Sequence, residues 1–294
     1  MPNPLKRLDR LWRRHLRNPL RARWRGWRYR AMPIAMVTGS KGKSTTTRLV
    51  ASILREMGHT VGVATTDDAR VGDEVLRVGD VAGASGAKLV LRDGRATAAA
   101  LETARGGVLL HGLYLRPVTA AALLNVGNDH VGMDGVATVD DMALVKRRVV
   151  DAARHVVLNA DDARCAALAG RYRSLNVTLC SLDPDSPNVA RHLAAGGKAV
   201  IMDNSHDIVI LEPGHRPRKL MAAADIPVTQ GGRIGHFISD ALAAAALGLA
   251  LGADDEEIRR GLATFARGPA QNPARMNFFA GYPFTLMVDR GLDP

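Results

Sequence analysis

The chain has 294 residues, with 40 Lys and Arg against 29 Asp and Glu. This length suits one large domain or two modest ones. A hydrophobic fraction of 47% with 23% charged residues excludes a chain that is disordered throughout. The two isolated cysteines, Cys165 and Cys180, exclude a disulfide scaffold and a cysteine-rich zinc site. They fit a reducing compartment, so we expect a cytoplasmic protein.

The net charge of +11 is concentrated at the N-terminus. Residues 1–33 hold eleven Lys and Arg against the single acid Asp9, which is +10, and the other 261 residues balance 29 bases against 28 acids. Leucines at helical spacing from Leu5 to Leu16 predict an amphipathic helix, which Pro19 should end. The sequence thus divides into a basic arm and a nearly neutral body. The arm also contains all three tryptophans: Trp12, Trp24 and Trp27.

Three interpretations of the arm are open. In the first, the arm is an interfacial helix for an anionic membrane surface, which would make the protein peripheral to the membrane. In the second, it is a phosphate-binding arm for nucleic acid, with tryptophans stacking on bases. In the third, it is a solvated extension that packs Trp12 or Trp24 onto its own body.

From Pro33 onward, strand patterns alternate with helix patterns. This order predicts an α/β fold, with a mostly parallel sheet flanked by helices on both faces. An uncharged apolar run of thirteen residues, Ala241 to Ala253, is too short for a membrane span of about 20 and predicts a buried helix. The predicted strands are 34–38, 61–65, 98–102, 120–126, 156–159, 177–180 and 199–202. The predicted helices are 43–57, 84–92, 138–153, 161–171, 236–251 and 254–266.

The clearest chemical motif is a phosphate loop between the first predicted strand and the helix after it. Its glycines let the backbone approach phosphates, and the helix N-terminus points at the anion. Lys43 would neutralise the β- and γ-phosphate oxygens, and the hydroxyl of Ser44 would face Mg²⁺. Val37 stands where the general motif has a glycine, so this is a shorter form. The loop consists of Gly39, Ser40, Lys41, Gly42, Lys43 and Ser44.

A phosphate loop alone leaves kinases, GTPases, ATPases and ligases open. The guanine-specifying Asn-Lys-x-Asp motif of GTPases is absent from the sequence. A strand of four apolar residues ending in Asp is absent as well. Its nearest equivalent is the run Ala98 to Glu102, which ends in Glu.

Four segments in order along the chain resemble the Mur ligase family of ATP-dependent amide-forming enzymes: Val37–Thr47, Leu101–Gly107, Asn125–Gly132 and Val157–Asp162. The Gly79–Gly83 turn and Leu101–Gly107 resemble one branch in particular, the Mur-like half of cyanophycin synthetase. Poly-γ-glutamate synthetase is a more distant relative. The resemblance implies that a carboxylate accepts the γ-phosphoryl group of ATP and that an amine then attacks the acyl-phosphate.

The resemblance assigns candidate catalytic and metal-binding residues. It implies that Glu102 and His130 are Mg²⁺ ligands, with Ser44 or Thr45 on the metal at the nucleotide side. Oxygen ligands suit this hard cation. Lys146 matches a lysine that is carbamylated in many Mur ligases, and the alternative is a solvated helix lysine.

Three more nucleotide contacts follow from the resemblance. Asp240 lies in the helix that contacts adenine, at a position where the family usually has Asn, and an ionised Asp offers only acceptors. Arg275 is a candidate phosphate contact. Asp289 keeps the ribose-binding position, but Leu292 and Asp293 replace the family's His and Asn nearby.

These matches predict three segments: a basic arm (residues 1–33), a Mur-type central ATP-binding domain (34–289) and the start of a linker (290–294). The lid domain that follows this linker in the family is absent from the sequence, so we expect a truncated enzyme or a partner that supplies the lid. The leading hypothesis is an ATP-dependent carboxylate–amine ligase acting on an amino acid or peptide. The alternatives are an ATP-binding module that does not ligate, and a scaffold tethered to membrane or nucleic acid by the arm.

Overall fold

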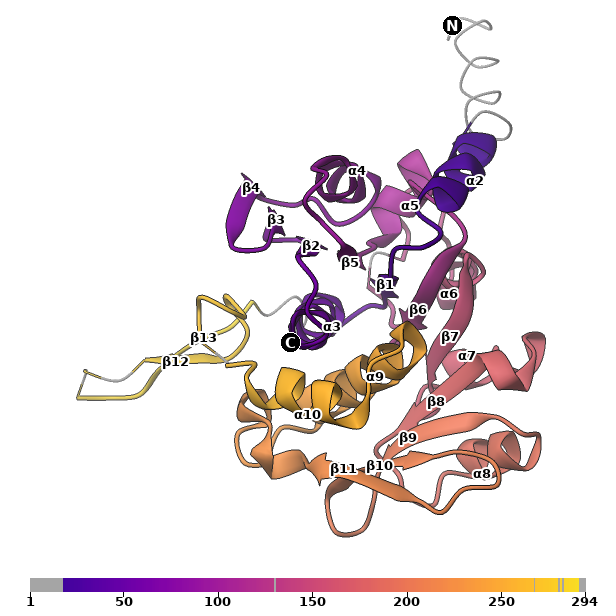
Figure 1. Ribbon diagram of the computed structural model, residues 1–294, viewed down its shortest axis with the longest axis vertical. Coiled ribbons are helices and arrows are strands. Elements are labelled where there is room, and N and C mark those ends of the chain that lie inside the picture. Colours follow the sequence, from indigo (N-terminus) through magenta and orange to yellow (C-terminus); the bar gives the residue numbers. More distant parts are fainter. Residues whose placement is uncertain (1–17, 130, 267, 280, 282, 291–294) are drawn as a thin grey trace, which may run out of the picture.

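The computed structural model describes residues 18–129, 131–266, 268–279, 281 and 283–290. Within these residues the main feature is an eleven-stranded sheet with helices on both faces (Figure 1). The strand order is β11-β10-β9-β8-β7-β6-β1-β5-β2-β3-β4. The predicted α/β class and the mostly parallel sheet are therefore confirmed.

The strands at the centre of this sheet, from β9 to β2, pair in parallel. They correspond to the strands predicted from sequence, because a parallel strand is buried on both faces and is encoded as a continuous apolar run. Their bounds are β1 Ile34–Thr38, β2 Val61–Ala64, β5 Ala98–Glu102, β6 Val118–Leu123, β7 Ala153–Asn159, β8 Val177–Ser181 and β9 Lys198–Met202.

The sequence did not predict the antiparallel strands that extend the sheet at its two edges. No residue of β4 is buried, so its pattern resembles that of a loop. A small two-stranded sheet near the end of the described chain was not predicted either, and its strand β13 is exposed throughout. These elements are β3 Asp68–Val71, β4 Glu74–Val78, β10 Asp207–Leu211, β11 Arg218–Ala222, β12 Asn277–Phe279 and β13 Leu286–Val288.

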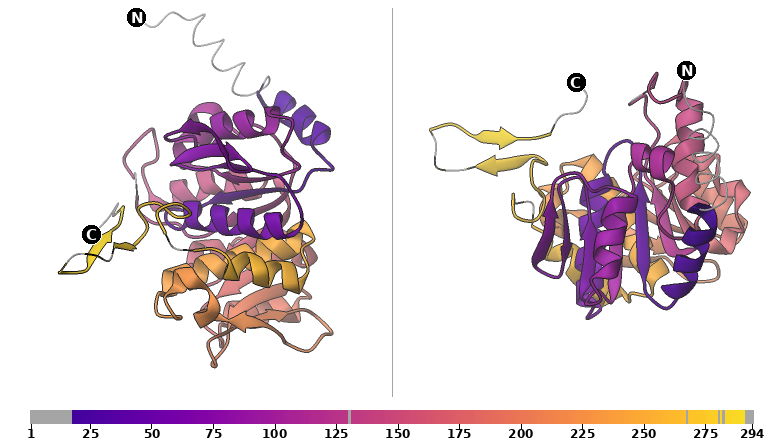
Figure 2. Two further views of the ribbon diagram at one scale, coloured as in Figure 1. Left: turned by 60° about the vertical axis from the view of Figure 1, so that its left-hand side comes forward. Right: turned by 90° about the horizontal axis from the view of Figure 1, so that it is seen from above.

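Helices form a layer on each face of the sheet, and the sheet curves around one of them (Figures 1 and 2). That inner layer contains α3 Lys43–Glu56, α9 Gly235–Leu251 and α10 Asp255–Ala263. Alternate residues of β1 face the two cores: Ala35 and Val37 face the inner layer, and Ile34 and Met36 face the other. The other layer contains α4 Ala84–Arg92, α5 Arg105–His111, α6 Val139–Val150, α7 Ala163–Ala166 and α8 Pro187–Ala194.

Local capping explains where several predicted helices begin and end. Thr138 and Asp141 form a capping box at the start of α6, and Asp254 and Glu257 form one at the start of α10. The helix predicted over 161–171 is wrong as one unit, because α7 ends after one turn and a 3-10 turn, Ala169–Arg171, follows. The apolar run predicted as a buried helix is confirmed over residues 241–251, which form the second part of α9, and its last two residues lie beyond the helix end.

The described part of the basic arm forms the helix α2 Asn18–Arg28. Pro19 therefore stands in the first turn of a helix, where its missing N–H costs nothing. Trp24, which one interpretation packs onto the body, is 57% exposed. No helix in the described ranges has both the length and the apolar character to cross a bilayer.

The strand order places one loop at a prominent position. The chain leaves β1 for β2 on one side, and later adds β6 on the other side of β1. In open α/β sheets, ligands bind at the carboxyl ends of strands where the order reverses in this way. The loop between β1 and α3 lies at this point.

Candidate functional site

The loop between β1 and α3 has the backbone of an anion-binding turn. Gly42 precedes α3 with φ +84°, in the left-handed region, and no side chain in the described ranges caps the helix. A Cβ at Gly42 would lie 2.2 Å from Oδ1 of Asp240. The N-terminus of a fourteen-residue helix therefore remains open to an anion, and only glycine fits at its start.

Polar contacts from β6 and α6 hold the first half of the phosphate loop. The Oδ1 of Asn125 accepts hydrogen bonds from the backbone N–H groups of Ser40 (2.9 Å) and Lys41 (2.8 Å). The Ser40 hydroxyl donates to Asp129 and accepts from Nζ of Lys146 at 2.6 Å. The loop is thus fixed by side chains that come more than eighty residues later in the sequence.

Lys146 is a buried lysine directed at the phosphate loop. It is 1% exposed, and its Nζ lies 3.7 Å from Oδ1 of Asp129. Burial lowers the pKa of Lys146 to about 8, the carboxylate of Asp129 opposes this shift, and Lys43 adds to it. A solvated helix lysine is therefore the wrong description of this residue.

Glu102 ends β5, the strand next to β1, and lies directly across from the loop helix. Its carboxylate is 1% exposed and accepts hydrogen bonds from the Ser44 hydroxyl (2.8 Å), the Thr66 N–H (3.0 Å) and the Thr66 hydroxyl (2.7 Å). Thr45 instead pairs with Asn272 at 3.4 Å. Of the two hydroxyls predicted from sequence, the structure brings Ser44 to Glu102.

These donors fit a Mg²⁺ ion. Glu102 and Ser44 supply hard oxygen ligands at the phosphate loop, and Mg²⁺ in nucleotide sites needs only one or two carboxylates besides phosphates and water. Among the described residues no group of three His, Cys, Asp or Glu side chains forms an all-protein cage. His130 lies outside the described residues.

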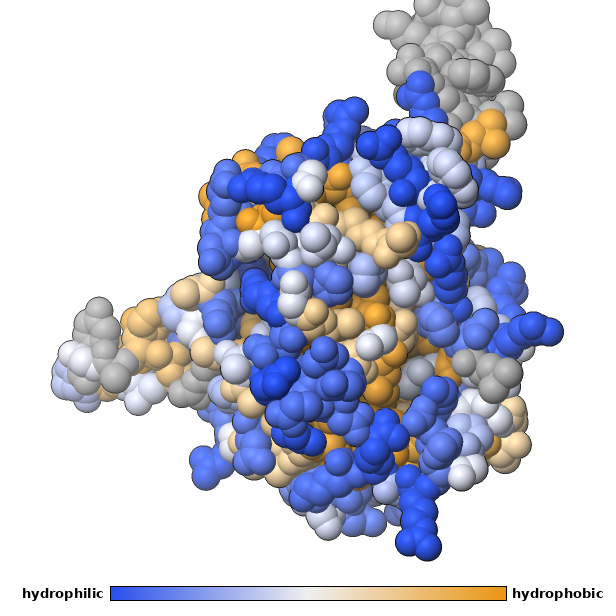
Figure 3. All heavy atoms as spheres, viewed as in Figure 1, coloured by the Kyte–Doolittle hydropathy of each residue, from blue (hydrophilic) through white to orange (hydrophobic). Residues whose placement is uncertain are grey.

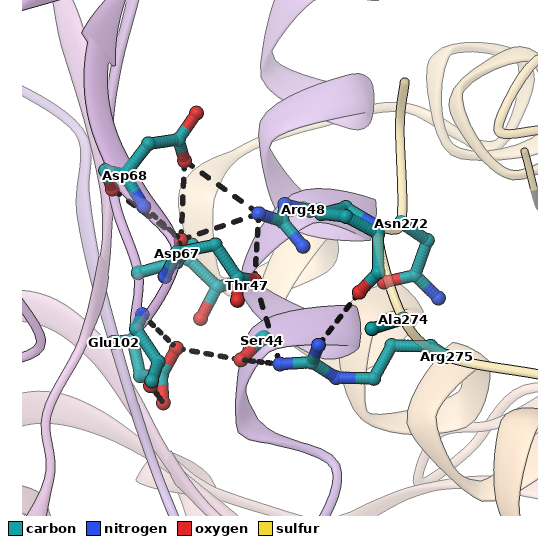
Figure 4. Close-up of polar contacts among 12 residues, drawn as sticks. Ser44, Thr47, Arg48, Asp67, Asp68, Glu102, Asn272, Ala274 and Arg275 are labelled. Carbon is teal, nitrogen blue, oxygen red and sulfur yellow. Dashed lines mark hydrogen bonds and ion pairs between the residues drawn. The ribbon is translucent and has the colours of Figure 1, made fainter. Parts of the chain in front are cut away.

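Three arginines contact Asp67 beside this site, and Figure 4 shows two of them, Arg48 and Arg275. The Asp67 carboxylate lies 3.0 Å from Arg48, 3.4 Å from Arg275 and 3.3 Å from Arg290. Nη2 of Arg275 also donates to the Ser44 hydroxyl at 3.0 Å. The structure therefore brings the predicted phosphate contact Arg275 to the loop helix, and Asp67 orients it.

Asp240 lies on α9 and packs against the loop from the inner layer. Its Oδ1 accepts a hydrogen bond from the Thr46 hydroxyl at 3.2 Å. Burial holds the pKa of Asp240 well above its usual range, while Thr46 and Lys43 act in the opposite direction. Burial therefore disfavours the ionised, acceptor-only form of this side chain, and a protonated carboxyl would also offer an O–H donor.

The remaining predicted residue, Asp289, lies on the exposed segment after β13. Its Oδ1 accepts a hydrogen bond from the Met276 N–H at 3.0 Å. Its charge also reaches His236 at the start of α9, where it opposes the lowering of the His236 pKa by burial. Asp289 is thus held close enough to the start of α9 to act on the charge of His236.

Sequence reasoning did not assign Thr66, Asp67, Asn125 or Asp129 a role. Asn125 and Asp129 fall inside a matched motif, which was a usable signal. Thr66 and Asp67 follow β2, two strands from β1, and only the sheet order brings them to Glu102 and Arg275. A cavity of about 510 Å³ opens beside the loop, lined by Ser40, Lys41, Asn125, Gly127, Asp129 and Asp162 among others.

A family model described as the Mur ligase middle domain matches residues 37–247, more than half of the chain. The chain belongs to the Mur ligase family. The matched residues include the phosphate loop, Glu102, Lys146 and Asp240.

Curated relatives within this family are cyanophycin synthetases. The protein from Trichormus variabilis is 37% identical over 266 residues, and that from Synechocystis is 38% identical. Each match covers 90% of this chain but only 29% or 30% of the relative. The UDP-N-acetylmuramoylalanine–D-glutamate ligase of Ralstonia nicotianae is 30% identical, with 80% of this chain and 46% of that protein covered. The chain therefore spans less than a third of the synthetases that it matches.

Solved structures agree on the fold. The UDP-N-acetylmuramoylalanyl-D-glutamyl-2,6-diaminopimelate–D-alanyl-D-alanyl ligase of Acinetobacter baumannii superposes with a TM-score of 0.60, covering 90% of this chain and 52% of that chain. A UDP-N-acetylmuramoyl-L-alanyl-D-glutamate–2,6-diaminopimelate ligase gives 0.63, with 88% and 50% covered. Both structures are 20% identical in sequence to this chain, so the similarity is evidence for the fold and for nothing further.

Proposed function

We propose that this chain binds Mg-ATP and carries out the phosphoryl-transfer part of a carboxylate–amine ligation. The observation that carries the proposal is the contact of Ser44 with the buried Glu102 across the phosphate loop. Membership of a family of ATP-dependent amide-bond ligases supports it. The nucleotide phosphates would lie on the loop, with the adenine towards Asp240 and the ribose towards Asp289.

The reaction has two balanced steps. A carboxylate oxygen forms a bond to the γ-phosphorus while the bond from that phosphorus to the β-bridging oxygen breaks, which releases ADP. The amine nitrogen then attacks the acyl carbon, loses a proton and displaces inorganic phosphate. Two anions must approach each other, so positioning and charge neutralisation carry most of the catalysis.

The residues of this chain have distinct roles in that scheme. Lys43, whose Nζ now donates to the Ser40 carbonyl at 2.8 Å, would move to the phosphate oxygens. Arg275, which donates a hydrogen bond to the Ser44 hydroxyl, would bind the γ-phosphoryl group during its transfer. Ser44 and Glu102 would hold Mg²⁺, which when bound shields the phosphate charge.

The test compares Lys43→Met with Lys88→Met, a matched change at an exposed lysine remote from the loop. We measure binding of a fluorescent ATP analogue with Mg²⁺, and hydroxamate formation when hydroxylamine traps the acyl-phosphate. N-acetylated aspartyl and glutamyl peptides serve as carboxylates, together with cyanophycin because the relatives are named for it. Lys43→Met should lower the rate of hydroxamate formation by about 10²-fold or more, and Lys88→Met should not.

Two other outcomes carry different conclusions. Mg-ATP binding that depends on Lys43, without hydroxamate from any carboxylate, would support the ATP-binding module that does not ligate. No difference between the two lysine variants in nucleotide binding would overturn the proposed site.

We further propose that Lys146 acts as a free amine that positions the phosphate loop. Its Nζ already bonds the Ser40 hydroxyl and faces the Asp129 carboxylate, which would repel the negative charge of a carbamate. Incubation with ¹³C-bicarbonate should therefore give no carbamate carbon signal that disappears in Lys146→Arg. Such a signal would instead identify Lys146 as the carbamylated lysine known from other Mur ligases.

A further inference from the structure

The helix α2 is attached to the body through its small and polar residues. The Ala22 carbonyl accepts a hydrogen bond from the Arg116 N–H at 2.9 Å, and Gly26 lies so close to the Arg116 carbonyl that a Cβ would be 2.1 Å from it. The Tyr29 hydroxyl, just after the helix, donates to the Leu91 carbonyl at 2.7 Å. This docking fixes which face of α2 points away from the protein.

The outward face of α2 is apolar and aromatic. Leu20, Trp24 and Trp27 have spacings of four and three residues, which place them on one stripe of the helix. They are 66%, 57% and 61% exposed. An amphipathic helix on a globular body usually turns its apolar stripe inward, so this reversed orientation indicates a partner surface.

Positive charge surrounds the stripe. Of the eleven residues in α2, four are arginines and none is acidic. The surface over α2 is mostly hydrophilic in Figure 3, at its upper right, with an apolar patch at the edge. A groove of about 1380 Å³ lies between α2 and α4, and its cationic lining residues are Arg25, Arg28, Lys88 and Arg92. No acid is among the described residues that line it.

We propose that α2 and this groove form a docking surface for an anionic phospholipid membrane. Tryptophan side chains favour the boundary between headgroups and acyl chains, because the apolar part of the ring contacts the acyl chains while its N–H stays hydrated. Arginines beside them can extend to the lipid phosphates while their stems cover apolar surface. The six bases of residues 1–17, against one acid, add further attraction to an anionic surface.

A membrane fits these residues better than a nucleic acid does. Leu20 is in line with both tryptophans and has no π face on which a base can stack, but it gains from burial among acyl chains. The apolar stripe is therefore better explained by a bilayer than by phosphate contacts alone.

The placement of α2 is compatible with catalysis on a membrane. The helix leads into the start of β1 and contacts the residues that precede β6, so it lies at the edge where these strands begin. The phosphate loop lies at the opposite edge, where β1 ends. A bilayer in contact with α2 would leave the nucleotide site open to solution.

The test is co-sedimentation of the full chain with vesicles of phosphatidylcholine alone, and with vesicles that also contain phosphatidylserine. The variant Leu20→Ser/Trp24→Ser/Trp27→Ser removes the stripe. The matched control Val78→Ser/Leu110→Ser/Leu144→Ser removes three other exposed apolar side chains. The stripe variant should partition onto anionic vesicles at least about tenfold less than wild type, and the control variant should bind like wild type.

A second readout locates the tryptophans. In a Trp12→Phe background, Trp24 and Trp27 are the remaining tryptophans. Their emission should shift to shorter wavelength on anionic vesicles and be quenched by brominated lipid. Unchanged Mg-ATP affinity and melting temperature in the stripe variant would show that it is folded.

Three results would overturn the proposal. The first is no binding of wild type to anionic vesicles. The second is equal binding by wild type and the stripe variant, which would assign attraction to charge alone. The third is stripe-dependent binding to a single-stranded 20-mer oligonucleotide in fluorescence anisotropy without vesicle binding, which would assign the surface to nucleic acid.

Discussion

Asp240 shows how burial changes what a residue offers to a ligand. Its raised pKa means that the folded protein holds the proton more tightly than the unfolded chain does. Stability from this group is thus fully present below the unfolded pKa of about 3.9, and it falls as pH rises towards the folded pKa. Asp240→Asn removes this loss because the amide does not ionise.

We therefore expect Asp240→Asn to raise the melting temperature relative to wild type at pH 8, with the gain shrinking as pH falls towards 4. Differential scanning calorimetry at several pH values measures this, with the exposed Asp185→Asn as the control. A gain that stays constant over the whole range would show that Asp240 is ionised in the folded protein.

Glu102 is the second residue whose environment makes a sharp prediction. Its two oxygens accept three hydrogen bonds, and Glu102→Gln would replace one acceptor oxygen by a donor that faces Ser44 or Thr66. We expect ATP turnover to fall by about 10²-fold or more and the free energy of unfolding to fall by about 1–3 kcal/mol. Turnover assays with a Mg²⁺ titration measure the first effect, and urea unfolding the second. The exposed Glu74→Gln should change neither, and unaltered turnover in Glu102→Gln would remove Glu102 from the site.

At the residue scale, the sequence predicted those groups that lie inside continuous motifs. The phosphate loop was predicted from its own pattern of residue types, and Glu102 and Arg275 were predicted from segments that resemble the family. Thr66 and Asp67 could not be found, because their role depends on β2 and β5 being adjacent in the sheet. The raised pKa of Asp240 also could not be read from sequence, since it follows from the burial of this side chain in the folded protein.

At the scale of elements, α10 packs closely against α3, the helix that follows the phosphate loop. A Cβ at Gly261 of α10 would lie 2.6 Å from Cα of Ile53 in α3, a backbone atom that cannot move alone. We expect Gly261→Ala to lower the free energy of unfolding by about 1–3 kcal/mol through overpacking. Gly170→Ala, where nothing lies within 4 Å of the added atom, should have little effect in the same urea titration. Equal stability of the two variants would mean that α10 can shift away from α3 at no cost.

The sequence predicted the elements with continuous patterns best. The central parallel strands are short apolar runs between turns, and the capping residues Thr138 and Asp254 mark the helix starts. Of the two outermost strands, β11 is partly exposed and β4 has no buried residue, so their patterns carry less information. Pro19 shows a further ambiguity, because proline both ends one helix and suits the first turn of the next.

At the scale of the whole molecule, the two cysteines can serve as probes of whether the two helix layers separate from the sheet together or one at a time. Cys180 lies in the core on the inner face of the sheet and Cys165 in the core on the other face. Both are buried, and burial raises the pKa of each thiol, which disfavours the reactive thiolate. Since the sheet that carries both cores is continuous from β11 to β4, we expect the layers to open together.

The measurement is labelling by an aromatic disulfide reagent of the single-thiol variants Cys165→Ala and Cys180→Ala, after the unfolding rate of each has been determined. Both remaining thiols should react at the rate of global unfolding, and at once in concentrated guanidinium. One thiol reacting at least about tenfold faster than its variant unfolds would reveal separate opening of that layer. Fast labelling of Cys180 would place this opening in the inner layer, beside the helix that follows the phosphate loop. Nucleotide bound at that loop should then slow the labelling of Cys180.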